Sequence, residues 1–374
     1  MNIQTPYYKI DIDKLYENIN NSIRRLREEA NCKVLIALKG FSVPSILKMI
    51  ADDLDGVSAS GLYESILGKK SIGKDVYTYS PAFKENEILE ISKNSTAVIF
   101  NSVAQFEKYH KIAHRYASCG IRVNPECSTL PENFKANPCS EFSRLGITIN
   151  NMPSLDMFGE NKIEGIHIHT MCEQNVDSLK YNIDVLKNKF GTYLKKIKWL
   201  NLGGGQLYAK DSYDLENAIK LLKDLRELYD IDIILEPCTG IVANCGYLVT
   251  SIIDIVHNGK DIAIIDGSAI CHIPDAAYIG WKRDIVGASS SGEFSYNYII
   301  AGCSCYAADV WGDYSFKKPL KVGDKIVFKD AAMYSIVKGN FFNGLKMPSI
   351  VVYSEKEGIN LISSYNFNTF LSLQ

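Results

Sequence analysis

Several features that mark particular protein classes are missing from this 374-residue chain. It has no run of about 18–20 apolar residues that could span a membrane, and its N-terminus lacks the basic-then-apolar pattern of a secretory signal. Its 41 Lys and Arg residues are slightly outnumbered by 43 Asp and Glu residues, so the basic excess of nucleic-acid-binding proteins is absent. No charge run or low-complexity tract predicts a disordered tail. We therefore expect neither a membrane nor a nucleic acid as a partner.

The ten cysteines form no CxxC pair of the kind that binds zinc. Cys303 and Cys305 are two positions apart, and the others are scattered. We therefore expect no metal site and a set of free thiols, which is typical of a reduced, cytoplasmic compartment. Hydrophobic residues make up 46% and charged residues 22% of the chain, an ordinary globular composition. The length is enough for a large core and two domains.

Eight apolar segments alternate with amphipathic ones over the first two thirds of the chain. The apolar segments are short, as expected of buried strands, and the segments between most of them have helical periodicity. This alternation predicts an α/β fold, a closed (β/α)8 barrel of the TIM type; a doubly wound open sheet is the alternative, which the count of eight disfavours. The expected strands are 33–39, 56–60, 76–80, 97–101, 120–124, 165–170, 199–202 and 231–236. The expected helices are 13–29, 44–54, 62–70, 85–92, 103–116, 176–196 and 213–229.

Helical periodicity is largely lost after about residue 251. Short strand candidates separated by Gly, Asp, Lys and Pro occur at 252–256, 262–266, 296–301, 325–328, 334–337, 350–353 and 360–362, and they predict a C-terminal all-β domain. Residues 7–12 also alternate as a strand and could pair with this domain. We therefore expect a barrel domain over 13–250 and a β domain over 251–374 together with 1–12.

Lys39 ends the apolar run that forms the first barrel strand, in the sequence Lys-Val-Leu-Ile-Ala-Leu-Lys-Gly-Phe at 33–41. Burying an ammonium group is costly and lowers its pKa. An amine with a lowered pKa is the nucleophile that forms a Schiff base with a carbonyl, including that of pyridoxal phosphate. The alternative is a lysine whose ammonium reaches solvent at the end of the strand.

Other polar residues fall at the carboxyl ends of the expected strands, where (β/α)8 barrels carry their chemistry. Gly203, Gly204 and Gly205 follow the seventh strand, and three successive amides without side chains can bind a phosphate, although glycine runs also occur in flexible loops. Glu236 ends the eighth strand. A carboxylate there can keep a pyridine nitrogen protonated, so that the ring accepts electrons; a capping or ion-paired carboxylate is the alternative.

Three further residues are candidates with simpler explanations. His167 and His169 are two positions apart on the sixth strand, and we expect their rings to point to opposite sides of it, so that the two cannot bind one metal ion. A buried core histidine is the alternative for either ring. Cys305, in the β region, is interpreted from its surroundings as a buried structural thiol.

Two motifs discriminate among enzyme families: Tyr-Ser-Pro-Ala-Phe-Lys at 79–84 and His-Ile-Pro-Asp at 272–275. With Ser-Arg-Leu-Gly at 143–146, His-Ile-His at 167–169, Met-Cys-Glu at 171–173 and Leu-Glu-Pro at 235–237, they resemble the fold-type III pyridoxal-phosphate decarboxylases. These enzymes combine an alanine-racemase-like barrel with a C-terminal β domain. Within this group the chain most resembles the carboxynorspermidine/carboxyspermidine decarboxylase family, and the matching motifs cover nearly the whole chain.

The resemblance implies roles for individual residues and a pyridoxal 5'-phosphate cofactor. The cofactor would be held by Lys39 as a Schiff base, by His169 against the ring, by Gly203, Gly204, Gly205 and Tyr334 at the phosphate, and by Glu236 at the pyridine nitrogen. Cys305 would be a catalytic thiol that reaches the active site of a partner subunit in a homodimer. The substrate-binding residues would be Glu236, His272, Asp275, Asp309 and Arg144.

The resemblance also implies a substrate, with alternatives. The expected reaction is α-decarboxylation of an amino acid with a 3-amino-3-carboxypropyl group on a polyamine nitrogen, as in polyamine biosynthesis. A decarboxylase of another aminocarboxypropyl or diamino acid is the alternative, because residues 238–240 and 267–271 and Ala308 differ from the family's usual pattern. A racemase and a non-catalytic cofactor-binding protein are the remaining alternatives. For Asp275 and, more so, Asp309, the alternative to a role in substrate binding is a surface turn.

Overall fold

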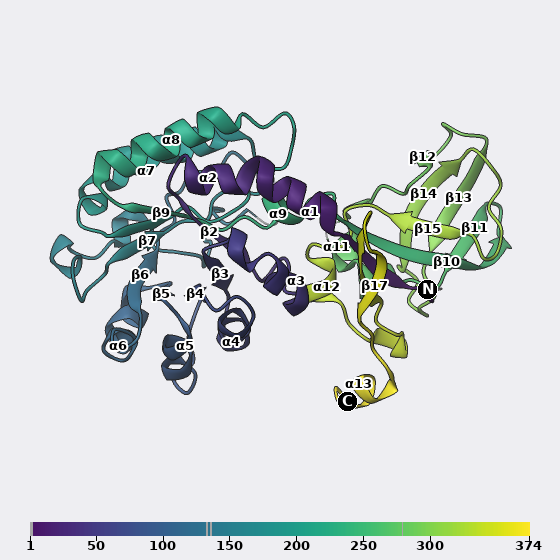
Figure 1. Cartoon of the computed structure of the whole chain (residues 1–374), viewed down its shortest axis with the longest axis horizontal. Coiled ribbons are helices and arrows are strands. Elements are labelled where there is room, and N and C mark those ends of the chain that lie inside the picture. Colours follow the sequence, from purple (N-terminus) through teal and green to yellow (C-terminus); the bar gives the residue numbers. More distant parts are fainter. Residues whose placement is uncertain (1–2, 132–133, 135–136, 279) are drawn as a thin grey trace. The chain divides into compact units, whose positions relative to one another are not determined.

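The computed structural model describes residues 3–131, 134, 137–278 and 280–374, and its chain divides into two compact units (Figure 1). One unit comprises residues 18–241, and the other comprises 1–17 together with 242–374. The boundary expected at 250 falls inside strand β10 (Gly246–His257), which belongs to the second unit. Among the described residues, no helix is both long and apolar enough to cross a lipid bilayer.

The first unit is a closed parallel barrel of eight strands, β2 to β9, in which β9 pairs back to β2. Each predicted strand is present, most of them shorter than expected: β2 (Lys33–Ala37), β3 (Gly56–Ala59), β4 (Asp75–Tyr79), β5 (Ala97–Phe100), β6 (Ser118–Arg122), β7 (Gly165–His167), β8 (Trp199–Asn201) and β9 (Asp232–Leu235). Helices α3 (Pro44–Met49), α4 (Leu62–Ser71), α5 (Ile88–Asn94), α6 (Val103–Ala113), α7 (Val176–Leu194) and α8 (Leu215–Tyr229) connect the strands, and a short α9 (Thr239–Val242) follows β9. The predicted helix 13–29 consists of α1 (Ile12–Asn18), a π-helical segment (Ile19–Ile23) and α2 (Arg24–Glu28). The predicted barrel is confirmed.

The inside of the barrel is filled by apolar side chains. Alternate residues of a strand share a face, and one interior level forms a packed cluster of Leu35, Tyr77, Ala97, Ile99, Trp199 and Ile234. Two glycines make room for the Trp199 indole, because a Cβ on Gly120 or Gly165 would lie 2.3 or 2.0 Å from its ring. The barrel therefore has a solid core, and any cavity must lie beyond it along the strands.

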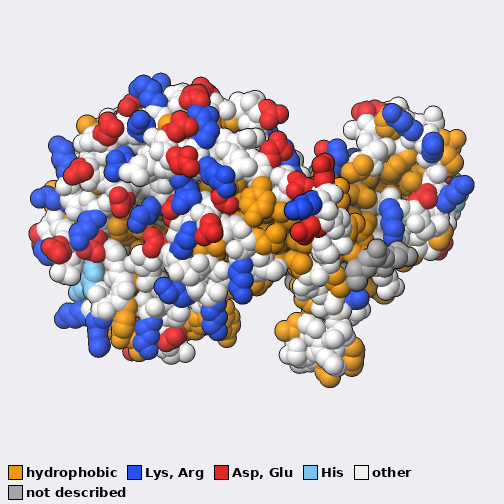
Figure 2. Space-filling view, in the orientation of Figure 1, with side chains coloured by type: hydrophobic (Ala, Val, Ile, Leu, Met, Phe, Trp, Pro, Cys, Tyr) orange, Lys and Arg blue, Asp and Glu red, His pale blue; other side chains and the backbone are white. Residues whose placement is uncertain are grey.

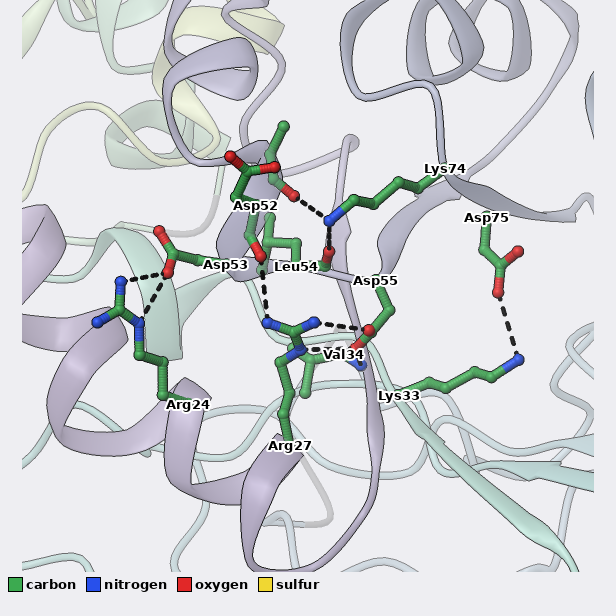
Figure 3. Close-up of polar contacts among 11 residues, drawn as sticks. Arg24, Arg27, Lys33, Val34, Asp52, Asp53, Leu54, Asp55, Lys74 and Asp75 are labelled. Atoms are coloured by element: carbon green, nitrogen blue, oxygen red, sulfur yellow. Dashed lines mark hydrogen bonds and ion pairs between the residues drawn. The ribbon is translucent and has the colours of Figure 1, made fainter.

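The amino ends of the first strands carry paired charges (Figure 3). Arg27 donates to both oxygens of Asp55 at 2.9 Å, and Asp55 also accepts the amide of Val34 at 2.8 Å. Arg24 pairs with Asp53 at 2.6 Å. These contacts tie α2 to the segment that leads into β3, so this end of the barrel is held by charge-assisted hydrogen bonds.

The second unit is built on a nine-stranded sheet in the order β12-β14-β13-β11-β10-β1-β16-β17, with β15 paired to β10. Strand β1 (Tyr7–Asp11) pairs antiparallel with β10 and parallel with β16 (Ser349–Ser354). The remaining strands are β11 (Asp261–Ile265), β12 (Ala288–Ser290), β13 (Tyr296–Ala301), β14 (Val310–Phe316), β15 (Lys325–Phe328) and β17 (Gly358–Ser363). The C-terminal β domain is thus confirmed, and the N-terminal segment lies inside its sheet.

Local expectations fail at several places in this unit. The predicted strand at 334–337 is helix α12 (Ser335–Lys338), which follows Tyr334 in a left-handed conformation with φ of 58°. Its β-branched residues favour a strand, but tertiary context overrides so short a preference. Strand β14 was missed because it contains Gly312 and Asp313, residue types that are depleted in strands. Short helices α10 (Ala269–His272), α11 (Pro274–Tyr278) and α13 (Phe367–Leu371) are also present.

Candidate active site

Polar residues occupy the barrel positions just beyond the apolar core. Lys39 continues the interior face of β2 beyond Leu35, and Glu236 continues the interior face of β9 beyond Ile234, because alternate residues of a strand share a face. These residues line a cavity of about 180 Å³ at the carboxyl ends of the strands. The lining consists of Lys39, Ser58, Ala59, Ser60, Tyr79, Pro81, Arg122, Leu145, His167, His169 and Glu236.

Lys39 lies in the turn after β2, with its side chain exposed to the cavity. The amides of Gly40 and Phe41 both donate to the carbonyl of Ala37, at 3.0 and 3.3 Å, and this turn ends the strand two residues before the predicted end. The surrounding protein lowers the pKa of the Lys39 ammonium by burial, Glu236 opposes part of that shift, and Arg122 adds to it. The amine is therefore closer to its nucleophilic form than an ordinary lysine is.

Glu236 faces the cavity with one oxygen held by the protein. Its Oε1 accepts a hydrogen bond of 2.7 Å from Asn201 Nδ2, while Oε2 is 3.9 Å from His167 Nε2, too far for a hydrogen bond. The Glu236 side chain is 6% exposed, and among the described residues it bonds to no helix amide and pairs with no lysine or arginine, so the alternatives of a capping or ion-paired carboxylate do not describe it. One carboxylate oxygen is left to meet a ligand.

His167 and His169 both line the cavity. The expectation that their rings point to opposite sides is wrong, because side chains alternate along a strand with a period of two and residues two apart share a face. The amide of Gly204 donates to His169 Nδ1 at 3.2 Å, which places the ring proton on Nε2. Burial, with the positive charges of Arg122 and Lys39, holds the pKa of both rings well below the ordinary value. Both imidazoles are therefore neutral near pH 7.

Arg122 and Tyr79, which sequence reasoning did not single out as site residues, form a polar group with Asn101. The Arg122 guanidinium lies 4.6 Å from the centre of the Tyr79 ring, and Tyr79 donates its hydroxyl proton to Asn101 Oδ1 at 2.7 Å. Asn101 Oδ1 also accepts the amide of Gly146, at 2.7 Å. The sequence feature that could have identified Arg122 is its charge, because it is the one charged residue in β6 (Ser118–Arg122).

The three glycines follow β8 beside His169 and Glu236. A Cβ on Gly203 would lie 2.7 Å from His169 Nδ1, and a Cβ on Gly204 would lie 2.3 Å from the Glu236 carbonyl oxygen. Gly203 also has φ of 66°, a left-handed value that favours glycine. Two of the three amides already donate within the protein, Gly203 to Asn201 Oδ1 at 2.8 Å and Gly204 to His169. The loop is thus built for close approach between backbone and cavity residues.

Cys305 and Asp309 lie in the connection between β13 and β14. The expectation of a buried structural thiol is wrong for Cys305, which is exposed, because this connection lies at the surface of the unit. Asp309 is 2% exposed, so it is no surface turn residue. Its oxygens accept the amides of Ala269 at 2.6 Å and Ser304 at 3.2 Å, which shapes the segment that presents Cys305.

His272, Asp275 and Tyr334 lie on neighbouring short elements of the same unit. Asp275 is 8% exposed and pairs with Lys338 at 2.6 Å, and the Lys338 ammonium lies 4.9 Å from the centre of the Tyr334 ring. His272 Nδ1 accepts the amide of Ser268 at 3.1 Å. Burial lowers the pKa of His272 to about 4, so its ring is neutral as well.

Arg144 is exposed and belongs to the barrel unit. Its backbone carbonyl accepts a hydrogen bond of 2.8 Å from Asn101 Nδ2. The neighbouring Leu145 lines the cavity, whereas the Arg144 side chain is not part of the lining. The structure therefore brings Lys39, His169 and Glu236 together and places Arg144 at the edge of this group.

The cavity residues fit pyridoxal phosphate. An amine with a lowered pKa can bind the aldehyde covalently, a carboxylate with one unoccupied oxygen can meet the ring nitrogen, and a neutral imidazole can lie against the ring. Glycines at positions where a Cβ would collide with cavity residues allow a phosphate to approach the backbone. In this arrangement Lys39, His169, Glu236 and the glycine loop would hold the cofactor.

Comparison with known proteins gives the same result. Residues 76–332 match the family model described as "Pyridoxal-dependent decarboxylase, C-terminal sheet domain". The chain is 38% identical to the carboxynorspermidine/carboxyspermidine decarboxylase of Campylobacter jejuni over 98% of each chain. It is 31% identical to the carboxyaminopropylagmatine decarboxylase of Synechocystis over 93% of this chain and 89% of that one. The crystal structure of Campylobacter jejuni carboxynorspermidine decarboxylase in complex with norspermidine superposes with a TM-score of 0.91 and 36% identity over all of both chains.

The decarboxylases that match are pyridoxal-dependent, and the residues that such a cofactor needs are present in the cavity of this chain. The protein therefore belongs to the pyridoxal-dependent decarboxylases and, among them, to the family of the carboxynorspermidine/carboxyspermidine decarboxylases.

Proposed function

We propose that this enzyme removes the α-carboxylate of carboxynorspermidine or carboxyspermidine, which leaves an aminopropyl group on the polyamine. The observation that carries the proposal is the Lys39 amine, with its lowered pKa, in one cavity with Glu236 and His169. The full-length match to a relative of that name supports the choice of substrate. We place the reaction in the cytoplasm, in keeping with cysteines that form no disulfide among the described residues.

Five parts of the chain serve the cofactor in this proposal. Lys39 would hold its aldehyde covalently. His169 would lie against the ring, Glu236 Oε2 would keep the ring nitrogen protonated, and Gly203 to Gly205 with Tyr334 would bind the phosphate. When bound, pyridoxal phosphate supplies an electron sink for the pair left when the bond between Cα and the carboxylate breaks. The neutral state of the His169 ring favours stacking, because it adds no second positive charge beside Lys39.

A homodimer with shared active sites completes the proposal. Cys305 would reach the partner's cavity and return a proton to Cα. It is exposed, beside Tyr306, whose ring lies 6.4 Å from that of Phe342. Tyr306 and Phe342 are 52% and 47% exposed, and Figure 2 shows hydrophobic side chains gathered on the drawn face of the β unit. An exposed aromatic surface around a thiol is what a subunit interface would cover.

Substrate recognition is assigned to Glu236, Arg144, His272, Asp275 and Asp309. Asp275 is the strongest candidate for a distal ammonium group, because its carboxylate is mostly buried and already accepts a cation from Lys338 at 2.6 Å. A substrate ammonium would have to displace or share that partner. Asp309 would act mainly by shaping the segment of Cys305, since its oxygens accept backbone amides.

The direct test is CO2 release by the purified enzyme from carboxynorspermidine, carboxyspermidine, carboxyaminopropylagmatine, diaminopimelate, ornithine and lysine. We expect the highest kcat/KM for the two carboxylated polyamines. Asp275→Asn should lower kcat/KM for these substrates by about ten- to a hundredfold, the value of a lost hydrogen bond to a charged group, and should leave the cofactor's visible absorbance unchanged. An unchanged kcat/KM for every amine would remove Asp275 from the substrate site.

The subunit arrangement has its own test. Lys39→Ala and Cys305→Ala proteins should each be inactive, and mixing them should restore activity in hybrid dimers that contain one intact site. Random exchange of subunits would give up to roughly a quarter of the wild-type rate. Mixtures as inactive as either parent, with subunit exchange shown by mass spectrometry of labelled chains, would place both residues in one subunit's site.

A second candidate substrate is carboxyaminopropylagmatine, which ends in a guanidinium group. The 31% identical Synechocystis relative carries this name, and a carboxylate such as Asp275 can bind a guanidinium through two hydrogen bonds. The same substrate panel decides between them, because a preference for the guanidinium substrate over both carboxylated polyamines would replace the first proposal.

A further inference from the structure

Asn201 connects Glu236 to the glycine loop. It is the last residue of β8 and is fully buried. Its backbone carbonyl accepts the amide of Ile168 at 2.8 Å, and its side chain contacts Glu236 and Gly203. The barrel framework therefore fixes where the Asn201 carboxamide lies.

The orientation of that carboxamide follows from its partners. The amide N–H of Gly203 can only donate, so the atom that it meets at 2.8 Å must be the Asn201 oxygen. The Asn201 NH2 group is then directed to Glu236 Oε1, at 2.7 Å. No rotation that exchanges the two ends of the carboxamide preserves both hydrogen bonds. The glycine loop thus determines which end of Asn201 the carboxylate receives.

We propose that Asn201 is the positioning residue for Glu236: it occupies Oε1 and so presents Oε2 to the nitrogen of the cofactor ring. The inference rests on the role proposed above for Glu236. Without Asn201, the carboxylate would have two equivalent free oxygens and a free torsion, and the ring nitrogen would lose its fixed partner. The arrangement also couples the loop proposed to bind the phosphate to the group that holds the ring proton.

The charges around Glu236 show why a neutral donor suits this position. Lys39 and Arg122 raise the local positive potential, and His167 is neutral at 3.9 Å from Oε2. Asn201 adds a hydrogen bond without adding a charge, so Glu236 stays available as the anionic partner of the ring nitrogen. An aspartate in its place would put two carboxylates in contact, and these could coexist only by sharing a proton.

The test uses full-length enzyme loaded with pyridoxal phosphate labelled with 15N in the ring. The 15N chemical shift reports whether the ring nitrogen is protonated, independently of turnover. Asn201→Leu and Glu236→Gln are compared with the wild type. Asn182→Leu is the matched control, because Asn182 is a buried asparagine whose side chain also donates and accepts hydrogen bonds, at 2.7 Å to Ser178 and 3.3 Å from Cys127, outside the cavity.

We expect a pyridinium shift in the wild type and in Asn182→Leu, and a neutral-pyridine shift in Glu236→Gln. Asn201→Leu should give a shift between these two, with a loss of about ten- to a hundredfold in kcat, the size of one hydrogen bond to a charged group. Asn201→Asp, which keeps the size of the side chain, should show a 15N shift that changes with pH where that of the wild type is constant.

A wild-type shift and wild-type kcat in Asn201→Leu, together with an altered shift in Glu236→Gln, would overturn the role of Asn201 and leave that of Glu236 intact. A wild-type shift in Glu236→Gln would instead overturn the proposed contact between Glu236 and the ring. If Asn201→Leu does not fold, Asn201→Asp decides the matter, because a pH-independent, wild-type shift in that variant would count against the proposal.

Discussion

The two ends of the barrel differ in whether their charged side chains have hydrogen-bond partners. At the amino ends, Arg27 and Asp55 share two hydrogen bonds of 2.9 Å (Figure 3), and Lys74 donates to the carbonyls of Ala51 and Leu54 at 2.8 Å. At the carboxyl ends, Lys39 makes no hydrogen bond to any described residue. Within the described part of the chain, Arg122 Nε and both ring nitrogens of His167 are also buried without partners.

This difference separates residues that stabilise the fold from residues that are available to contact a ligand. Charges that are paired with each other lower the free energy of the folded state and are unavailable for other contacts. Charges left without partners in a cavity cost stability, and a ligand that supplies the missing partners recovers that cost. The same set of strands therefore carries a stabilising end and a reactive end, and substitutions at the two ends should have separable effects.

The largest expected effect is on activity, from Lys39→Ala. Removing the amine should abolish covalent attachment of the cofactor and lower kcat by roughly a thousandfold or more, as expected for a residue that reacts directly. Thermal stability of the cofactor-free protein should stay the same or rise, because an ammonium without a hydrogen-bond partner is removed from the cavity. The measurements are visible absorbance, peptide mapping after borohydride reduction, and CO2 release. If borohydride reduction of the wild-type enzyme attaches the cofactor to a lysine other than Lys39, the assignment of Lys39 is wrong.

The second effect is the pH dependence of stability at the reactive end. The pKa of His167 is held well below its ordinary value of 6.5 by burial and by Arg122, His169 and Lys39. Below pH 6.5 the unfolded chain binds a proton that the folded protein does not, so stability is full above pH 6.5 and falls as the pH falls. The slope is about 1.4 kcal/mol per pH unit for each such histidine.

Urea denaturation of the cofactor-free enzyme between pH 5 and 7 measures that slope. His167→Gln should flatten this slope by the contribution of one histidine. Equal slopes in the wild type and in His167→Gln would mean that the ring is accessible to protons in the folded protein.

The third effect is on the stabilising end, from Asp55→Asn. It removes the charge that pairs with Arg27 but keeps an oxygen that can accept the amide of Val34. The free energy of unfolding should fall by about 1–3 kcal/mol, with kcat and KM unchanged. Urea denaturation and CO2 release together test this separation. A large loss of kcat at wild-type stability would break the contrast between the two ends.

The smallest effect is expected from Lys33→Met, at the same end of the barrel. Lys33 pairs with Asp75 at 3.4 Å, and the two side chains are 41% and 29% exposed. Solvent screens such a pair, so its loss should change the free energy of unfolding by less than about 1 kcal/mol. The variant is also the control for Lys39→Ala, since both remove a lysine from the first barrel segment. If Lys33→Met lowered the free energy of unfolding as much as Asp55→Asn, the solvent exposure of an ion pair would not predict its contribution to stability.

Much of the fold followed from periodicity. The eight strands were predicted because apolar runs bounded by turns leave few alternatives, and Lys39 stood out because a charge ending such a run is unusual. Arg122 and Asn201 were missed, since neither belongs to a motif and their significance depends on what lies opposite them in the closed barrel. The strand predicted at 334–337 was wrong, because three β-branched or small residues do not outweigh the backbone turn at Tyr334.

The sequence by itself determined the alternation of strands and helices, the β character of the C-terminal part, and the residue types at the strand ends, because these depend on local periodicity. Only the tertiary structure decided that the face shared by His167 and His169 lines the cavity, that Cys305 is exposed, and that Asp275 already has a cationic partner. Each of these depends on contacts between segments far apart in the chain. Such contacts are set by how the barrel and the sheet pack, and no local pattern of residues encodes them.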